Sequence, residues 1–392
     1  MKTLKRTWAD ISLDNLEYNY RSIRAHLPQG TKFLGVMKAD AYGHGAVPVS
    51  RALADLGAEY LAVSNLEEAV QIRRGEVRLP ILILGYTPAE YAANMIFLDI
   101  TQEVHSLEYA RELNEALAGT NYILNVHLKL DTGMTRIGFF AYDNERTLDE
   151  LRQVAQLPHL HIEGVFMHFC VADSRAEADV SFTKLQYKRF MDMLSAMAGV
   201  GIRPEIRHCC NSGATILYPE FALDMVRPGI ITYGNAPSDE LEGALSLRPM
   251  MSLHSMIAQV RTVPAGTDIS YGRLYRTKEE TRVAVLPIGY ADGLSRLLTG
   301  KASFYLQGHQ VPVIGRICMD MCMIDVSGVP EAEPGDVVTI FGYDDDGTLL
   351  PCERLARAQG TINYELLCQI SKRIPRICHR GAETSQILQY IV

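Results

Sequence analysis

The sequence feature that most constrains the fold is an apolar run that ends on a lysine. Residues 33–37 have the length and composition of a buried strand, and Lys38 follows them directly. Gly and polar residues at 39–45 form a turn before a helical pattern begins at Ala46. Lys38 is therefore predicted to lie where a strand reaches the surface, where burial of its stem would favour a free amine able to form a Schiff base. Taken alone, a lysine in this place more often simply reaches for solvent.

Beyond Lys38 the pattern alternates between strand-like and helix-like segments. We expect strands at residues 60–63, 81–84, 96–100, 123–128, 162–167 and 206–208, and helices at 46–56, 66–74, 107–117, 143–155 and 179–197. A short strand near Trp8 and a helix ending near Leu27 precede them. Such alternation is typical of parallel βα units, and about eight of them favour a closed barrel over an open sheet.

The pattern of apolar and polar residues changes from about Leu245 onward. Alternating runs at 283–286, 303–306 and 337–341, separated by Gly, Pro and Asp, predict an all-β region with helices only at 352–358 and 364–373. The 392 residues also exceed what one core usually holds. We therefore predict an α/β fold: an N-terminal (β/α)8 TIM-like barrel at residues 1–244, then a mostly β C-terminal domain at 245–392. One exception is included in this prediction: the strand near Trp8 can pack on the second domain instead of the barrel.

Composition excludes several classes of protein. With 47% hydrophobic and 21% charged residues the chain is typical of a soluble globular protein. A formal net charge of −8 disfavours nucleic acid as a partner, and no apolar stretch has the length of a membrane span or a signal core. We expect a cytoplasmic protein. Its eight cysteines form no regular framework and predict reduced thiols without a metal site.

Residues 36–45, Val-Met-Lys-Ala-Asp-Ala-Tyr-Gly-His-Gly, resemble the cofactor-lysine signature of the alanine racemase family. The resemblance recurs in the expected order along nearly the whole chain. It implies an enzyme that interconverts L-alanine and D-alanine with pyridoxal 5'-phosphate (PLP), has a barrel and a C-terminal β domain, and works as a homodimer with shared active sites. Supply of D-alanine for peptidoglycan is the role that the resemblance implies.

The residues implied to hold PLP are Lys38, Tyr42, Ser212, Arg227, Gly229, Ile230 and Tyr364. Residues 211–213 are predicted to open a helix after a strand, where backbone N–H groups bind anions, although Ser212 in such a place can also be an ordinary helix cap. By resemblance Arg227 faces the pyridine nitrogen. Arginine does not give up its proton, so the nitrogen would stay unprotonated and transamination would be limited.

Racemisation requires proton transfer on both faces of the α carbon, so one base does not easily serve. By resemblance Lys38 acts on one face and Tyr271, in Ile-Ser-Tyr-Gly, acts on the other from the second subunit. A phenol is a weak base at neutral pH, and the resemblance implies that His168 tunes it, linked to Arg207 or another cation. Without motif support, such a histidine would more often be structural.

The remaining motifs are implied to bind the substrate. Arg136 matches the arginine that binds the substrate carboxylate, and Lys129 matches a lysine that can be carbamylated and pair with it. Tyr290, Met319 and Asp320 match residues of the substrate entrance. Tyr364 bounds the side-chain pocket and favours alanine, because a smaller polar residue would make room for a hydroxymethyl group.

Three other functions were weighed. A serine or broad-specificity racemase of the same family is the nearest alternative. A PLP decarboxylase of basic amino acids would carry an acidic partner for the pyridine nitrogen and a cysteine as second base, and Arg227 and Tyr271 argue against it. A non-catalytic PLP carrier would lack the β domain. Without motif support, Lys129 and Arg227 would be read as ordinary surface residues.

Overall fold

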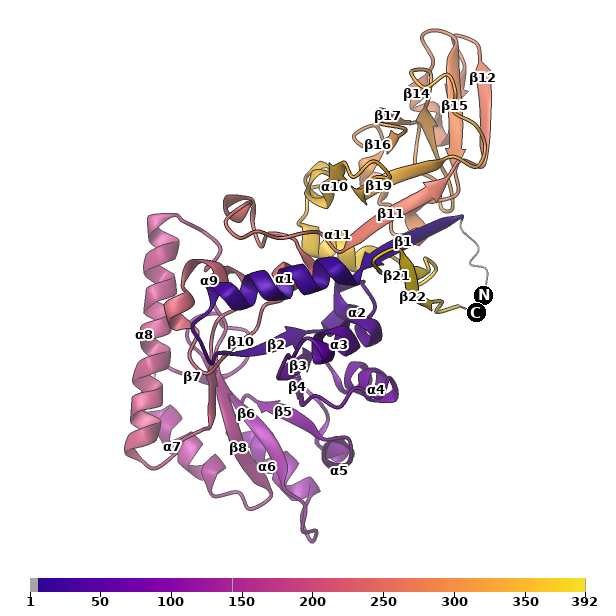
Figure 1. Cartoon of the computed structure of the whole chain (residues 1–392). Coiled ribbons are helices and arrows are strands. Elements are labelled where there is room, and N and C mark those ends of the chain that lie inside the picture. The colour runs from indigo at the N-terminus through magenta and orange to yellow at the C-terminus, as the bar shows by residue number, and fades with distance from the viewer. Residues whose placement is uncertain (1–5, 143, 392) are drawn as a thin grey trace. The chain divides into compact units, whose positions relative to one another are not determined.

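A computed structural model describes residues 6–142 and 144–391 of the chain (Figure 1). These residues form two compact units. The barrel unit comprises residues 16–41 and 46–248, and the β unit comprises residues 6–15, 42–45 and 249–391. The domain limits set from the sequence, 1–244 and 245–392, remain a prediction.

The barrel unit is built on eight parallel strands in the order β10-β2-β3-β4-β5-β6-β8-β9. Their bounds are β2 Lys32–Val36, β3 Tyr60–Val63, β4 Ile81–Ile83, β5 Ile100–Val104, β6 Leu124–Asp131, β8 Leu160–Phe166, β9 Ile206–His208 and β10 Met225–Val226, with the short β7 Phe139–Phe140 beside β6. Backbone hydrogen bonds from Asp224 to Arg207 and from Arg227 to Cys210 link the two ends of the sheet. The predicted barrel is thus confirmed.

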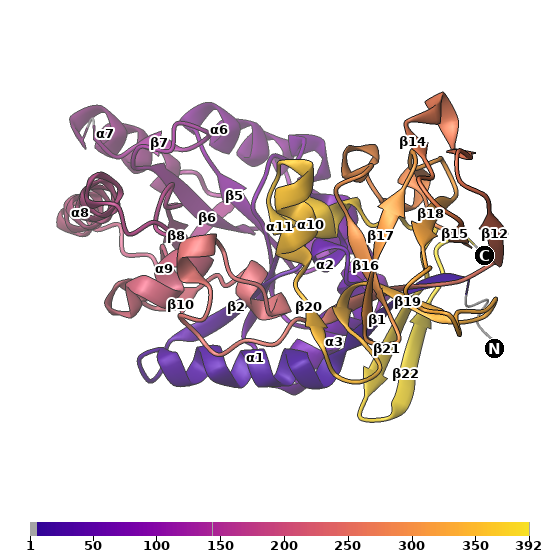
Figure 2. The same cartoon turned by 90° about the horizontal axis from the view of Figure 1, so that it is seen from above.

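Helices surround these strands, as the view from above shows (Figure 2). They are α1 Leu13–His26, α3 Ala46–Asp55, α4 Leu66–Arg74, α5 Ala92–Phe97, α6 Leu107–Ala116, α7 Asn144–Ala155, α8 Glu177–Gly199 and the short α9 Ser212–Leu217. Side-chain caps fix where two of them begin, because Asn65 accepts from the Glu68 N–H and Ser106 accepts from the Tyr109 N–H. Every residue of β3, β4 and β5 is buried between the helices and the barrel interior.

One predicted strand is wrong. Residues 96–100 were expected to be extended, but Ile96 and Phe97 end α5 and the strand begins only at Ile100. Asp99 adopts a positive φ of 52°, which turns the chain between the helix and the strand. Apolar residues of a helix end and of the following strand had merged into one run, a case in which periodicity does not separate the two.

The β unit contains a large sheet in the order β12-β15-β18-β17-β16-β19-β11-β1-β21-β22, with β20 beside β19. The bounds are β1 Thr7–Ser12, β11 Met251–Met256, β12 Gln259–Val263, β15 Thr281–Leu286, β16 Ser303–Leu306, β17 His309–Ile314, β18 Cys322–Asp325, β19 Val337–Tyr343, β20 Leu349–Leu350, β21 Arg376–Arg380 and β22 Glu383–Leu388. A separate pair joins β13 Asp268–Ile269 to β14 Tyr275–Arg276. Two helices, α10 Cys352–Gln359 and α11 Asn363–Gln369, complete the unit. The predicted all-β character of this region is confirmed.

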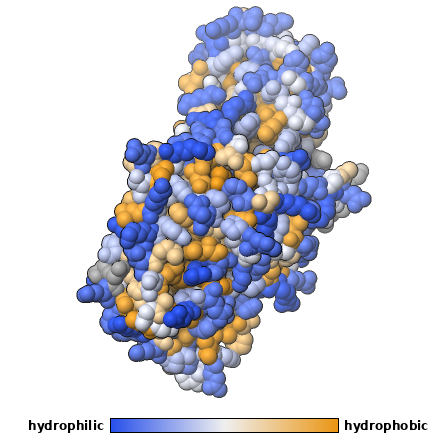
Figure 3. All heavy atoms as spheres, turned by 60° about the vertical axis from the view of Figure 1, so that its left-hand side comes forward, coloured by the Kyte–Doolittle hydropathy of each residue, from blue (hydrophilic) through white to orange (hydrophobic). Residues whose placement is uncertain are grey.

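The strand β1 comes from the start of the chain but lies inside the sheet of the β unit. It pairs antiparallel with β11 and parallel with β21. None of the described helices is long and apolar enough to cross a membrane. The face drawn in Figure 3 accordingly mixes hydrophilic and hydrophobic areas without a continuous apolar band.

A buried arginine ties a short segment near Lys38 to the C-terminal strands. The side chain of Arg376 is only 1% exposed. Its guanidinium donates to the carbonyl oxygens of Gly43 (2.9 Å), Ile370 (2.7 Å), Ser371 (2.6 Å) and Ile374 (2.6 Å). Arg376 therefore holds Gly43 within the β unit, and its other three hydrogen bonds fix the segment between α11 and β21.

Arg376→Met should destabilise the protein by about 3 to 5 kcal/mol, because it leaves buried carbonyl groups without donors. The matched control is Arg380→Met, at the exposed end of the same strand, which should change stability by less than about 0.5 kcal/mol. Urea unfolding followed by circular dichroism measures both variants. Equal midpoints for the two variants would contradict the role given to Arg376.

Candidate active site

Six predicted site residues lie at the carboxyl ends of barrel strands, where parallel strands share one rim. They are Lys38 after β2, Lys129 near the end of β6, Arg136 after β6, His168 after β8, Ser212 after β9 and Arg227 after β10. The pKa of His168 indicates that the basic residues of this group lie close to its imidazole. Loss of hydration first, and then the positive charges of four cations, lower the pKa of its imidazole well below the usual 6.5; the cations are Arg227, Lys129, Arg136 and Lys38. The structure therefore places four basic side chains near one histidine.

Lys38 begins a left-handed turn. Ala39, Asp40, Ala41 and Tyr42 all have φ between 52° and 55°, a conformation that L residues other than glycine rarely adopt in succession. Each such residue costs about 1 to 2 kcal/mol in an isolated chain. Strain of this kind persists only where the surroundings impose it and is concentrated at functional sites.

The surroundings of the turn supply fixed hydrogen bonds. The Ala41 N–H donates to the Met37 carbonyl at 2.8 Å, which closes the turn. Glu68 on α4 accepts from the Ala39 N–H at 2.7 Å and from the Ser64 N–H at 2.8 Å. The Asp40 carboxylate accepts from the Ala46 N–H at 2.8 Å, at the start of α3. Lys38 is thus presented by a backbone that is anchored on both sides.

Arg227 is the buried centre of the barrel-unit site, with 4% of its surface exposed. Its Nη2 donates to the carbonyls of Met167 (2.6 Å) and Cys209 (3.1 Å) and lies 3.4 Å from Nδ1 of His168. Its Nη1 lies 2.9 Å from Nδ1 of His208. Among the described residues, the Nε–H and one of the two Nη1–H groups have no partner, so the arginine keeps two donors for a ligand.

The cation beside His168 is therefore Arg227 and not Arg207. Arg207 lies on the opposite face of β9 and pairs with Asp224 through two hydrogen bonds of 2.7 and 3.0 Å. The burial pattern of β9 alternates buried, exposed, buried, so His208 points inward and Arg207 outward. Because arginine only donates, Nδ1 of His168 accepts and its proton is on Nε2.

Lys129 is buried, with 4% of its surface exposed. Its ammonium lies 3.1 Å from the Leu130 carbonyl and 5.2 Å from the centre of the Phe166 ring. Burial, followed by the charges of Arg227 and Arg136, lowers the pKa of Lys129 to about 7. A large share of this side chain is therefore a neutral amine at neutral pH.

Ser212, Gly229 and Ile230 form a small polar corner of the barrel unit. Oγ of Ser212 accepts from the Gly229 N–H at 2.9 Å, so the hydroxyl proton stays available for a further acceptor. Ile230 follows and is fully buried. The capping role considered for Ser212 belongs to Asn211, whose side chain accepts from the Ala214 N–H at 3.1 Å.

The other predicted residues lie in the β unit. Tyr42 is buried, and its ring centre lies 5.9 Å from that of Tyr364 in α11. Burial raises the pKa of Tyr42 far above the usual 10, so its phenol stays protonated and can donate. These two tyrosines therefore offer neighbouring hydroxyl groups.

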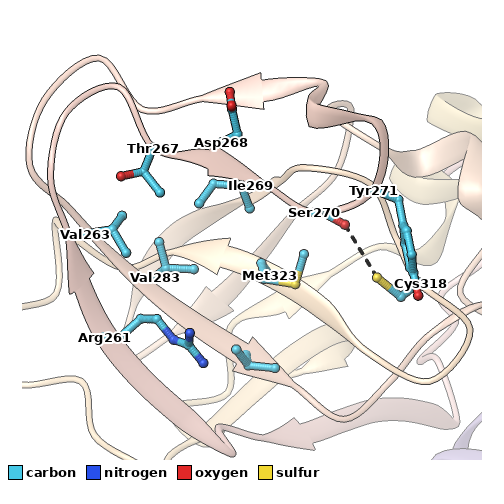
Figure 4. A pocket seen from close by; sticks show the side chains of 11 residues that line it. Arg261, Val263, Thr267, Asp268, Ile269, Ser270, Tyr271, Val283, Cys318 and Met323 are labelled. Atoms are coloured by element: carbon cyan, nitrogen blue, oxygen red, sulfur yellow. Dashed lines mark hydrogen bonds between the residues drawn. The ribbon is translucent and has the colours of Figure 1, made fainter.

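Tyr271 is 69% exposed and sits on a strained turn. Ser270, Gly272 and Arg273 have φ values of 64°, 73° and 52°. Oγ of Ser270 donates to the Arg316 carbonyl at 2.7 Å and so fixes the start of the turn. The side chain borders an open cavity of about 470 Å³ lined by apolar residues of β12, β13, β15 and β18 and by the polar side chains of Arg261, Thr267, Asp268 and Ser270 (Figure 4).

Tyr290, Met319 and Asp320 are brought together with one another by two loops. The N–H groups of Tyr290 and Ala291 donate to the carbonyls of Cys318 and Met319 at 3.1 and 3.0 Å. Tyr290 is 41% exposed and Met319 is 53% exposed. Asp320 pairs with Arg373 at 2.8 Å.

Two acidic residues that the sequence analysis did not identify support these groups. Asp292 is fully buried, pairs with Arg6 at 3.1 Å and accepts from the Gly289 N–H at 3.1 Å, which fixes the turn that carries Tyr290. Glu68 likewise fixes the turn that follows Lys38, because its carboxylate accepts from the Ala39 and Ser64 N–H groups. The sequence does give a signal for Asp292, because this acidic residue lies within Gly-Tyr-Ala-Asp-Gly at residues 289–293, beside Tyr290. No feature of the sequence near Glu68 links that residue to Lys38.

Comparison with known proteins places this geometry in a family. The family models described as "Alanine racemase, N-terminal domain" and "Alanine racemase, C-terminal domain" match residues 11–237 and 250–378. A protein named alanine racemase from Desulfovibrio desulfuricans is 46% identical over 370 residues, which cover 94% of this chain and 97% of that protein. Another from Clostridium tetani is 42% identical over 392 residues, with 100% of both chains covered.

Solved structures agree with these sequence relatives. Alanine racemase from Clostridium difficile 630 is 40% identical and superposes with a TM-score of 0.94 over 100% of both chains. Alanine racemase from Bacillus anthracis with bound L-Ala-P is 34% identical, with a TM-score of 0.92 over 100% of this chain and 99% of the other. Both domain types and the full length of the relatives are present here. The chain therefore belongs to the alanine racemase family, whose members are isomerases.

Proposed function

We propose that this enzyme interconverts L-alanine and D-alanine with PLP as cofactor and two bases, Lys38 and Tyr271. The observation that carries the proposal is the group of basic side chains at the barrel rim, where Nη2 of Arg227 lies 3.4 Å from Nδ1 of His168. No carboxylate among the described residues lies within ion-pair distance of Lys129, Arg136 or Arg227. Basic residues that are not paired directly with a carboxylate fit a ligand that brings anionic groups, such as a phosphate and a carboxylate.

The donor set suits PLP in particular. PLP, when bound, draws electrons from the α carbon of an amino acid and so makes its proton removable. Lys38 supplies the amine that would hold it, and the free Nε–H of Arg227 supplies a donor for the ring nitrogen. Donors suited to the phosphate are the hydroxyl groups of Tyr42, Ser212 and Tyr364 and the backbone N–H of Ile230, with Gly229 beside them through its hydrogen bond to Ser212.

The chain's own residues would handle the proton as follows. Nζ of Lys38 takes or returns it on one face of the α carbon, and Oη of Tyr271 of the partner subunit does so on the other. His168 carries its proton on Nε2, so it can donate to the phenol oxygen and favour the deprotonated tyrosine. Arg136 would hold the substrate carboxylate, with Tyr290, Met319 and Asp320 at the entrance.

The exposure of the β-unit residues supports a homodimer with shared sites. Tyr271, Tyr290 and Met319 are all more than 40% exposed, together with Leu274 (59%) and Met321 (51%). Large apolar side chains gathered on neighbouring loops mark a surface that another chain covers. We also propose, from the resemblance to the family, a cytoplasmic enzyme that supplies D-alanine for peptidoglycan.

Lys38→Ala should abolish racemisation, and Tyr271→Phe should lower its rate about 10²- to 10⁴-fold, because each removes one of two bases. Circular dichroism of L-alanine over time measures both, and a parallel assay with L-serine separates a broad-specificity racemase. If the sites are shared, a heterodimer of the two variants has one site with both bases intact. Coexpressed, doubly tagged heterodimer should regain activity; heterodimer as inactive as its parents would contradict the shared site.

Lys129 should form a carbamate with dissolved CO2. Its neutral amine can attack the carbon of CO2, forming an N–C bond and releasing one proton to solvent, and the resulting anion is stabilised by Arg136 and Arg227. Protein equilibrated with ¹³C-bicarbonate should show a carbamate carbon signal that weakens as pH falls below about 7, the pKa of Lys129. The signal should vanish in Lys129→Arg and persist in Lys188→Arg, an exposed control. A signal unchanged in Lys129→Arg would refute the assignment.

The protein should lose stability as pH falls below 6.5. Burial lowers the pKa of His127, and lowers those of His168 and His208 further, so the unfolded chain takes up protons that the folded chain refuses. The free energy of unfolding has its full value above pH 6.5. Below this pH it falls by about 1.4 kcal/mol per pH unit for each histidine that stays neutral in the folded chain. Urea unfolding across this range tests it. His208→Asn should flatten the slope, whereas His309→Gln, at an exposed site, should not.

A further inference from the structure

A chain of hydrogen bonds runs from Arg227 through the interior of the barrel unit, away from the rim. Nη1 of Arg227 lies 2.9 Å from Nδ1 of His208, and Nε2 of His208 lies 2.9 Å from Nδ1 of His127. Nε2 of His127 lies 3.1 Å from Oε2 of Glu163. Both imidazoles are completely buried. Two histidines thus connect a buried cation with a carboxylate on β8.

The far end of the chain is fixed by further donors. The Tyr60 hydroxyl donates to Oε1 of Glu163 at 2.7 Å, and the Thr101 hydroxyl donates to Oε2 at 3.3 Å. Glu163 therefore accepts from β3, β5 and β6 at once. Burial alone would raise the pKa of Glu163, but the hydrogen bonds from His127 and Tyr60 outweigh it and hold the pKa below its usual value.

The two ends determine the direction of every bond between them. Arginine can only donate, so Nδ1 of His208 accepts and the proton of this neutral ring is on Nε2. That proton leaves Nδ1 of His127 as an acceptor and places the proton of His127 on Nε2, which donates to the carboxylate. Burial lowers the pKa of both rings, in agreement with neutral imidazoles. Reversing either ring would place two N–H groups, or two bare nitrogens, face to face.

Packing leaves the rings little freedom to move. A Cβ added to Gly164 would lie 2.5 Å from Cε1 of His127, so only glycine next to Glu163 leaves room for this ring. The Phe166 ring stacks on His208 with centres 4.9 Å apart and planes at 9°. The guanidinium carbon of Arg227 lies 5.3 Å from the same Phe166 ring.

We propose that Glu163 and His127 are positioning residues for Arg227: through His208 they supply its counter-charge and hold its guanidinium in one orientation toward the ligand. Neither residue lies at the barrel rim, and neither matches a motif in the sequence. The consequence for PLP rests on the proposed function, whereas the directed chain itself does not. Without it, the Arg227 side chain would keep its carbonyl partners on Nη2 but would lose the only bond that fixes Nη1 among the described residues.

The first test needs no cofactor, and variants serve only to assign the signals. In apoprotein labelled with ¹⁵N-histidine, long-range ¹H–¹⁵N spectra at neutral pH should show His127 and His208 as neutral rings protonated on Nε2. Single substitutions of each histidine assign the signals. A proton on Nδ1 of either ring, or a doubly protonated ring, would overturn the proposal whatever the cofactor.

The second test measures the positioning role in the loaded enzyme. Glu163→Gln removes the charge but keeps the shape, and Glu205→Gln removes a nearby exposed carboxylate before β9 as the matched control. Misplacement of Arg227 should lower kcat about 10- to 100-fold with KM changed less than twofold. The control should leave both constants unchanged. A Glu163→Gln enzyme with the kcat of the control would overturn the positioning role, while a protein that binds no PLP would instead contradict the proposed function and leave the NMR result standing.

Discussion

The buried guanidinium of Arg227 is the interaction on which the rest of the site depends. A cation inside a barrel is costly unless its donors are satisfied, and here two carbonyls and two histidines accept from Nη1 and Nη2 of Arg227. Because arginine cannot accept, it dictates which nitrogen of each neighbouring histidine carries the proton. The same residue lowers the proton affinity of Lys129 and His168. One charge therefore sets the chemistry of the barrel-unit rim.

Backbone strain complements this electrostatic order. The turn after Lys38 and the turn at Tyr271 both hold non-glycine residues at positive φ, and each is fixed by side-chain hydrogen bonds from elsewhere in its unit. Strain of this kind reduces the motion of the groups that the turns present. Each of the two proposed bases thus lies at a turn that contains non-glycine residues at positive φ.

Sequence reasoning located the strand ends well because a buried parallel strand must be apolar and must stop where a polar residue begins. Strands β3 and β9 have the predicted bounds, and Lys38, His168 and Arg227 follow strands as expected. Sequence reasoning failed where residues distant in the sequence determine the local conformation. The left-handed turn carries no glycine to reveal it, and the strand expected at 96–100 merged a helix end with β5. The choice of Arg227 over Arg207 as the cation beside His168 depended on strand parity, which a three-residue strand shows only once its register is known.

The central claim is that two different groups exchange protons with the two faces of the α carbon. Turnover of L-alanine in D2O, with the hydrogen isotope at Cα read by NMR early in the reaction, tests it most directly. The account predicts that newly formed D-alanine carries solvent deuterium at nearly every molecule, because the proton removed by one base is not the one delivered by the other. D-alanine that retains the original proton of the substrate would show a single base and would contradict the account.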